Sequence, residues 1–129
     1  MIDPKLTYAV IWASNNTEKY WYKVFKDLIE KWFKAIAINP NEVNTILWQE
    51  VYPTLLDYYN KNWNVDIAIF VVPPKITLEI LKKIVKWNNL NIKSMWFQPW
   101  SESKDVISFC KENNIDFIAN SCIMIQSNL

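Results

Sequence analysis

The chain contains no glycine, so each of its turns has to be made by a residue that carries a Cβ atom. Ordinary usage is about 7% glycine, which would give roughly nine in a chain of this length. Eight tryptophans are present, and all but Trp96, which lies in a strand-like run, fall at or near junctions where a residue without Cβ is usual. These junction residues are Trp12, Trp21, Trp32, Trp48, Trp63, Trp87 and Trp100. The pattern indicates that tryptophan occupies glycine positions, among them a loop, two helix ends and a turn.

Short apolar runs alternate with amphipathic runs along the whole chain. The apolar runs predict strands over residues 7–11, 35–38, 50–52, 65–72, 92–97 and 116–119. Helical spacing of apolar residues predicts helices over 20–31, 76–86 and 102–113, with one further helical turn at 55–59. Such alternation is typical of a parallel sheet covered on both faces. We therefore expect a single α/β domain over residues 1–129, a Rossmann-like, doubly wound, mainly parallel sheet of five to six strands with helices on both faces.

Charge and residue usage remove several classes of function. All 14 basic residues are lysine and the net charge is +1. The chain therefore shows neither the clustered basic face nor the arginines that usually indicate nucleic-acid binding. Histidine, the commonest general base and metal ligand, is absent, and two cysteines make no disulfide framework or zinc site. No signal peptide is visible, and no apolar run reaches the roughly 18 residues of a membrane span. We expect a cytoplasmic protein with a small-molecule nucleotide ligand, no metal, no nucleic acid and no membrane contact.

In a doubly wound sheet, a ligand binds outside the carboxyl ends of the strands, where the strand order reverses. The segments predicted at this edge are residues 12–16, 39–41, 71–74, 98–101 and 120–122. They offer amides, hydroxyls and backbone groups but almost no titratable side chain, whereas Asp66 and Asp116 fall at strand starts, on the opposite edge. Because no acid pair or nucleophile–base pair is visible, we expect a binding site without catalytic residues, and enzymatic activity stays uncertain.

The segment after the first strand is a candidate phosphate site. It leads into the first predicted helix, whose free N–H groups and positive dipole end suit an anion. The Ser14 hydroxyl offers a further hydrogen bond, and Lys19 or Lys23 offers positive charge. The alternative is structural, namely that residues 14–17 simply cap the helix.

The end of the second predicted strand counts against an NAD-dependent enzyme. NAD-binding domains usually carry an acid there for the ribose hydroxyls. Here the strand is followed by Asn39 and Pro40, with no carboxylate until Glu42. An NAD(P)-linked or nucleotide-sugar enzyme therefore stays an alternative, and Asn39 with Pro40 is also read as a plain strand terminator.

Three further segments are candidates for the ligand edge, and two of them carry two interpretations each. Pro73 and Pro74 either line one wall of a groove or start a helix. Gln98 follows a strand and is predicted at the ligand edge. Cys122, just past the last strand, is either a thiol near a ligand or a plain buried cysteine, whereas Cys110 is expected in the core.

Seven short motifs in a fixed order carry a resemblance to a known family. They are YAVIWAS (8–14), AINPN (37–41), VYPTL (51–55), VDI (65–67), FVVPP (70–74), MWFQP (95–99) and ANSCIM (119–124). From about Lys5 to Gln126 the chain resembles the stand-alone coenzyme A-binding domain proteins. These are small Rossmann-like proteins related to the nucleotide-binding domain of succinyl-CoA synthetase, and they are generally described as binding modules with no established reaction.

The resemblance implies a ligand, coenzyme A or an acyl-CoA, and a position for it. The CoA diphosphate would lie against residues 13–15, the adenosine end would pack by residues 39–40 and 71–73, and two amide side chains would close the edge. The predicted cofactor-binding residues are Trp12, Ala13, Ser14, Asn15, Lys23, Asn39, Pro40, Val71, Pro73, Gln98 and Asn120.

The chain departs from the family at four glycines. The family pattern has glycine where this chain has Trp12, Trp32, Trp48 and Trp100, whereas Trp96 is a tryptophan that the pattern itself contains. An indole at position 12 would fill space that the diphosphate needs. The literal sequence is therefore expected to bind CoA weakly or not at all.

Our hypothesis is that the written sequence misreads a reassigned codon, with UGA meaning glycine but translated as tryptophan. The lack of glycine and the lysine- and asparagine-rich, arginine-free composition of an A/T-rich gene motivate it. A deliberate glycine-free design is the rival account. If the tryptophans are real, we expect left-handed backbone strain at Trp32, Trp87 and Trp100 wherever φ is positive. A regulatory or partner-binding domain with a blocked pocket is then the further alternative.

Overall fold

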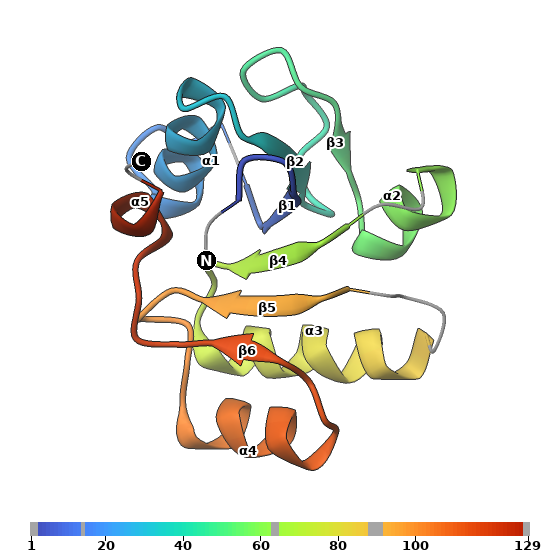
Figure 1. The fold of residues 1–129 in the computed structure, drawn as a ribbon. Helices are drawn as coiled ribbons and strands as arrows, with labels where there is room; N and C mark the ends of the chain where they lie inside the picture. The colour runs from blue at the N-terminus through green and yellow to red at the C-terminus, as the bar shows by residue number, and fades with distance from the viewer. Residues whose placement is uncertain (1–2, 14, 63–64, 88–91, 128–129) are drawn as a thin grey trace.

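Six strands form one parallel sheet in the order β3-β2-β1-β4-β5-β6 in the computed structural model, which describes residues 3–13, 15–62, 65–87 and 92–127 (Figure 1). The strands are β1 (Thr7–Ile11), β2 (Lys34–Ile38), β3 (Val51–Tyr52), β4 (Ile67–Phe70), β5 (Ser94–Phe97) and β6 (Phe117–Ile118). Every pairing is parallel, and the strand order reverses between β1 and β4. The predicted Rossmann-like, doubly wound α/β fold is confirmed.

Helices cover both faces of the sheet. α1 (Tyr20–Glu30) and α5 (Ile123–Gln126) pack on one face, and α2 (Leu55–Asn62), α3 (Pro74–Trp87) and α4 (Lys104–Glu112) pack on the other (Figure 1). Successive side chains of a strand point to opposite faces, so Tyr8 and Val10 join the core under α1, whereas Ala9 and Ile11 join the core under α3. All of β1 is therefore buried, as expected for the central strand of a sheet covered on both sides.

Three differences from the sequence-based expectation stand out, beside shifts of one or two residues at the ends of other elements. The pattern does not predict α5, because its four residues are too few to show a helical period. α2 runs through Asn62 rather than forming the single turn expected at 55–59. β4 is shorter than the apolar run 65–72, because its neighbours end at Ile11 and Phe97, level with Phe70, and leave Val71 and Val72 without strand partners.

Helix α1 begins later than the predicted caps. Its N-cap is Lys19, which makes no side-chain capping hydrogen bond, so the expectation that Asn15, Asn16 or Thr17 caps this helix is wrong. The Asn16 side chain instead accepts a hydrogen bond from the Glu18 amide at 3.2 Å, within the loop. The end of β1 at residue 11 and the start of α1 at residue 20 nevertheless agree with the predicted bounds. Ser14, in this loop, and Trp63 lie outside the described residues.

The end of α1 has the geometry that normally calls for glycine. The Trp32 amide donates to the Ile29 carbonyl and the Phe33 amide donates to the Leu28 carbonyl, at 3.1 and 3.0 Å. This pair of bonds is the Schellman motif, in which the residue after the C-cap is left-handed and is usually glycine. Trp32 is that residue, with φ of 66° and an indole that is 91% exposed. The expected left-handed strain at Trp32 is confirmed.

A second left-handed tryptophan lies in the segment between β2 and β3. Ile46 and Gln49 exchange two backbone hydrogen bonds, at 3.0 and 2.8 Å, around a two-residue reversal. The residues between them, Leu47 and Trp48, have φ of 49° and 69°, which is the type I′ arrangement that favours Asn-Gly. The Trp48 indole is 94% exposed and packs on no core.

The remaining junction tryptophans behave differently. Trp21 lies in the first turn of α1, so its predicted placement in a junction is wrong. Trp87 is the last residue of α3 and does not have positive φ, so its predicted placement at a left-handed helix cap is also wrong. Trp100 lies in a turn after β5 but does not have positive φ, so no left-handed strain arises there. Trp96 lies in β5 as expected.

Candidate functional site

The predicted edge segments meet in pairs at the carboxyl ends of the strands. The segment after β1 bonds to the segment after β2, because the Trp12 amide donates to the Ile38 carbonyl at 2.6 Å. The segments after β4 and β5 meet through the Gln98 amide, which donates to the Phe70 carbonyl at 3.1 Å. Between the two pairs lies the point where the strand order reverses, which in this fold class is where ligands bind.

Asn39 holds the loop that follows β1. Its side chain is buried, with Nδ2 donating to the Ala13 carbonyl at 3.0 Å and Oδ1 accepting from the Asn41 amide at 2.9 Å. Ala13 is also fully buried. Asn39 therefore positions the main chain of the loop from beneath, while Pro40 beside it is exposed at the edge.

A carboxylate reaches the same loop from beyond β2, which the sequence analysis did not anticipate. Glu42 Oε1 accepts a hydrogen bond from the Asn15 amide at 2.9 Å, and Asn15 Nδ2 donates to the Thr45 carbonyl at 3.1 Å. The only sequence signal for this contact is an acid four residues after the end of β2. The direction of the Glu42 side chain depends on the course of the loop, which the pattern of residues does not specify.

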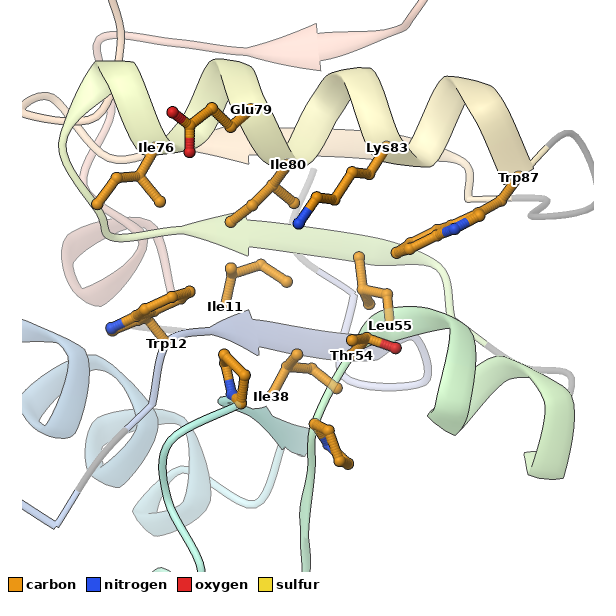
Figure 2. Close-up of a pocket in the computed structure, with 12 residues that line it drawn as sticks. Ile11, Trp12, Ile38, Thr54, Leu55, Ile76, Glu79, Ile80, Lys83 and Trp87 are labelled. Atoms are coloured by element: carbon orange, nitrogen blue, oxygen red, sulfur yellow. The ribbon is translucent and has the colours of Figure 1, made fainter.

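Trp12 occupies one end of a cavity between α2 and α3, over β1 and β2 (Figure 2). Its φ is 76°, again in the left-handed region. The cavity measures about 180 Å³, and Figure 2 shows the Trp12 indole at one end and the Trp87 indole at the other, with Ile11 and Leu55 between them. The further lining residues are Ile38, Pro40, Pro53, Thr54, Ile76, Glu79, Ile80 and Lys83. This space is mainly apolar, and the Trp12 indole takes up its end nearest the carboxyl edge.

Trp100 closes the edge beside β4. Its indole Nε1 donates to the Val71 carbonyl at 2.9 Å, and its ring packs against Tyr20 at the start of α1 in a tilted arrangement, with centroids 4.6 Å apart and ring planes at 40°. Lys23 Nζ lies 5.3 Å from the centroid of the Tyr20 ring, an arrangement that allows a cation–π contact. The Val71 carbonyl therefore already accepts a hydrogen bond from the protein itself, whereas Pro73 and Lys23 are exposed.

Gln98 makes its side-chain hydrogen bonds inside the protein. Its side chain is fully buried, Oε1 accepts from the Ile123 amide at 2.8 Å, and Nε2 donates to the Cys122 sulfur at 3.4 Å. These bonds fix the start of α5 against the end of β5. Asn120, by contrast, is exposed in a left-handed conformation with φ of 61°, which asparagine tolerates, and its amide donates to Glu102 Oε2 at 2.8 Å.

No constellation for catalysis or metal binding appears in the part of the chain that the structure describes. Within it, no three histidine, cysteine, aspartate or glutamate side chains gather closely enough to hold a metal ion. Of the helices described, none combines the length and the apolar character that a membrane crossing requires. Asp66 lies at the amino edge as predicted, where it accepts from the Thr7 amide and pairs with Lys93 at 3.3 Å.

The two cysteines are expected to react very differently with a thiol reagent. Burial raises the pKa of the Cys110 thiol to about 11, and its side chain has no exposed surface, whereas Cys122 is half-buried. At pH 8 the folded chain should therefore give one equivalent of labelling by a chromogenic disulfide, abolished by Cys122→Ser, with the second equivalent appearing only in denaturant. Because folding favours the protonated Cys110 thiol, its contribution to stability should be complete below about pH 8.5 and decline towards pH 11. Rapid labelling of Cys110 in the native Cys122→Ser variant would contradict this.

The chain matches the model of a protein family described as the CoA binding domain, over residues 6–128. The chain belongs to this family. The match spans the sheet, all five helices and each of the edge segments described above. No curated protein shows significant sequence similarity to this CoA-binding domain.

Solved structures agree with the fold of this CoA-binding domain. A conserved hypothetical protein from Pyrococcus furiosus is 31% identical, with a TM-score of 0.82 over 94% of this chain and 98% of that one. A hypothetical protein from Pyrococcus horikoshii is 24% identical, with a TM-score of 0.74 over 95% and 80% of the two chains. A protein from Thermus thermophilus is 21% identical, with a TM-score of 0.75 over 94% and 87%. The last two similarities concern the fold alone.

The predicted binding residues fall into two groups in this CoA-binding domain. Around the cavity and the β1–α1 loop, the structure brings together Trp12, Ala13, Asn15, Asn39 and Pro40. On the other side of the strand-order reversal lie Val71, Pro73, Gln98 and Asn120, while Lys23 borders the edge from α1. Ser14 belongs to the loop but lies outside the described residues, and the ligand role of each of these residues remains a prediction.

Proposed function

We propose that this protein is a CoA- or acyl-CoA-binding module that acts without catalytic residues of its own. The observation that carries the proposal is the family match over residues 6–128, which includes every edge segment. The loop after β1 supports it, because main-chain amides and the uncharged side chains of Asn15 and Asn39 gather there beside the Glu42 carboxylate, and such donors suit a phosphate ligand.

The proposed pose follows the two sides of the edge. The diphosphate lies along the loop of Ala13, Ser14 and Asn15, with Lys23 supplying positive charge. The adenosine packs against Pro40 and the adjoining apolar cavity, with Asn39 holding the loop beneath it. On the other side of the strand-order reversal, Val71, Pro73 and Asn120 border the ligand. Gln98 supports this side from beneath, because its buried side chain holds the start of α5.

The Trp12 side chain does not fit the ligand at this site. Its indole fills the end of the cavity nearest the carboxyl edge, where the main chain has to approach the diphosphate. We propose that position 12, with positions 32 and 48, is glycine in the natural protein and that the written sequence reads a reassigned UGA codon as tryptophan. Positive φ at all three residues and indoles more than nine-tenths exposed at two of them support the proposal, because no packing there requires a large side chain. The coding DNA tests it directly, since TGG at these codons refutes the misreading.

A second candidate function follows if Trp12 is genuine. The indole then acts as a plug, and the protein is a partner-binding or regulatory domain with a closed pocket. The observation that favours it is the packing of Trp12 against both core clusters, which an indole merely lodged in solvent would not show.

A ligand panel distinguishes these functions. Thermal unfolding of the purified chain and of Trp12→Gly should be followed with CoA, acetyl-CoA, NAD, NADP, ADP and buffer alone. We expect a rise in melting temperature with CoA and acetyl-CoA in Trp12→Gly, because a ligand that binds only the folded state stabilises it by an amount that grows with the logarithm of ligand concentration over dissociation constant. A rise in melting temperature with NAD instead of CoA supports the NAD(P)-linked enzyme. If no nucleotide raises the melting temperature of either protein, the result favours the partner-binding or regulatory domain with a closed pocket.

A further inference from the structure

Two loops at the carboxyl edge are joined by a carboxylate and an amide. Glu42 Oε1, from the segment after β2, accepts the main-chain N–H of Asn15, from the loop after β1, at 2.9 Å. The Asn15 side chain reinforces the junction by donating to the Thr45 carbonyl at 3.1 Å. The Asn15 amide thus donates to a negative charge supplied by the chain itself.

The position of this bond matters because the same amide belongs to the proposed diphosphate site. A main-chain N–H in this loop is a donor for an anion, and a hydrogen bond to an ionised acceptor is roughly twice as strong as one between neutral groups. Glu42 is only partly buried and its hydrogen bond to Asn15 is exposed, so salt screens its charge and the repulsion of an anion is strongest at low salt. The carboxylate therefore occupies the place of a phosphate oxygen and repels any phosphate that approaches.

We propose that Glu42 is a resident anion that competes with the ligand's phosphate for the Asn15 amide, and so sets how strongly this site binds phosphate-bearing ligands. The proposal rests on the proposed function, because it concerns the same loop. A ligand phosphate displaces the carboxylate, accepts the Asn15 N–H in its place and releases the Glu42 side chain to solvent. No covalent bond changes in this exchange.

The charge on Glu42 is the property to test. Glu42→Gln keeps the shape of the side chain and its ability to accept a hydrogen bond, but removes the charge. Glu50→Gln is a matched control, since it removes the same charge from the same inter-strand segment at a residue whose hydrogen bond goes to the Tyr52 hydroxyl and not to the β1–α1 loop. A comparison of the two variants separates the local contact from the general effect of net charge.

The probe is inorganic pyrophosphate, and the readout is the backbone amide resonance of Asn15. All titrations, including the one with CoA, use the full chain carrying Trp12→Gly as the parent, so that the indole does not obstruct the ligand. We expect Glu42→Gln to bind pyrophosphate about tenfold more tightly than this parent at low salt, and Glu50→Gln to differ from the parent by less than about twofold. Equal affinities in Glu42→Gln and Glu50→Gln overturn the proposal, as does an Asn15 resonance that does not move in any variant.

A parallel titration with CoA keeps the two proposals distinguishable. If pyrophosphate shows the Glu42-dependent gain but CoA binds no more tightly than pyrophosphate, the resident anion stands and the CoA-binding function fails. If CoA binds specifically but with equal affinity in both glutamine variants, the function stands and the role of Glu42 fails.

Discussion

Replacing Trp12 with glycine is expected to strengthen CoA binding by about 10- to 100-fold. The indole fills the end of the cavity nearest the carboxyl edge, so CoA binding to the written sequence has to expel a partly buried aromatic ring. Returning such a ring to water costs on the order of 1.5–3 kcal/mol, which corresponds to this range of affinity. Calorimetric titration of both proteins with CoA measures the change.

Two further variants identify the cause of the gain. Trp12→Ala removes the indole but keeps Cβ on a backbone with φ of 76°, so it should recover most of the affinity while remaining less stable than Trp12→Gly. Trp87→Ala opens the far end of the same cavity, away from the carboxyl edge, and should change CoA affinity by less than about threefold. Equal dissociation constants for the native chain and Trp12→Gly would show that the indole does not obstruct the ligand.

The fold was predictable because its signals are local and repeated. Each central strand is a short apolar run ended by a polar or proline segment, and α1 and α3 bury one side of a clear helical period. Both ends of β1 were predicted correctly, because the strand is buried on both faces and its run of strand-forming residues ends at Ile11. The end of β4 was not predicted, because Val71 and Val72 are as buried as the strand residues although they have no strand partners, so burial alone does not mark the end of the strand.

The site was only partly predictable because it depends on where loop side chains turn. The sequence placed Asn39 at the correct edge but not its bonds to Ala13 and Asn41, which bury it beneath the loop. Gln98 was likewise placed at the edge, yet its side chain turns inward to α5, an element too short to be predicted. Glu42 was dismissed as too far along the chain, although the loop folds back and brings its carboxylate to Asn15. Topology follows from local pattern, whereas such contacts require the path of the loop.

The same substitution, tryptophan to glycine, is expected to change stability in opposite directions at different positions. Trp32→Gly and Trp48→Gly should each raise the free energy of unfolding by about 1 kcal/mol. A left-handed residue with Cβ costs roughly 1–2 kcal/mol, and the greater freedom of glycine in the unfolded chain offsets part of the gain. Trp96→Gly should lower the free energy of unfolding by at least about 3–5 kcal/mol, because it empties a buried site in β5 and removes the bond from the indole Nε1 to the Ser121 carbonyl. Urea denaturation of the three variants measures these differences.

Alanine at the two exposed positions isolates the contribution of the backbone. Trp32→Ala removes the same exposed indole as Trp32→Gly but leaves Cβ in the left-handed Schellman position, so it should gain little, and Trp48→Ala should behave alike in the type I′ turn. Because the two positions lie in separate segments and neither indole is buried, the gains from the two glycine variants should add in the double variant to within about 0.5 kcal/mol. If alanine and glycine stabilise equally, the penalty lies in the exposed indole and not in φ. The argument for glycine at these positions would then lose its physical basis, because the free energy of unfolding would not depend on whether the left-handed residue carries a Cβ atom.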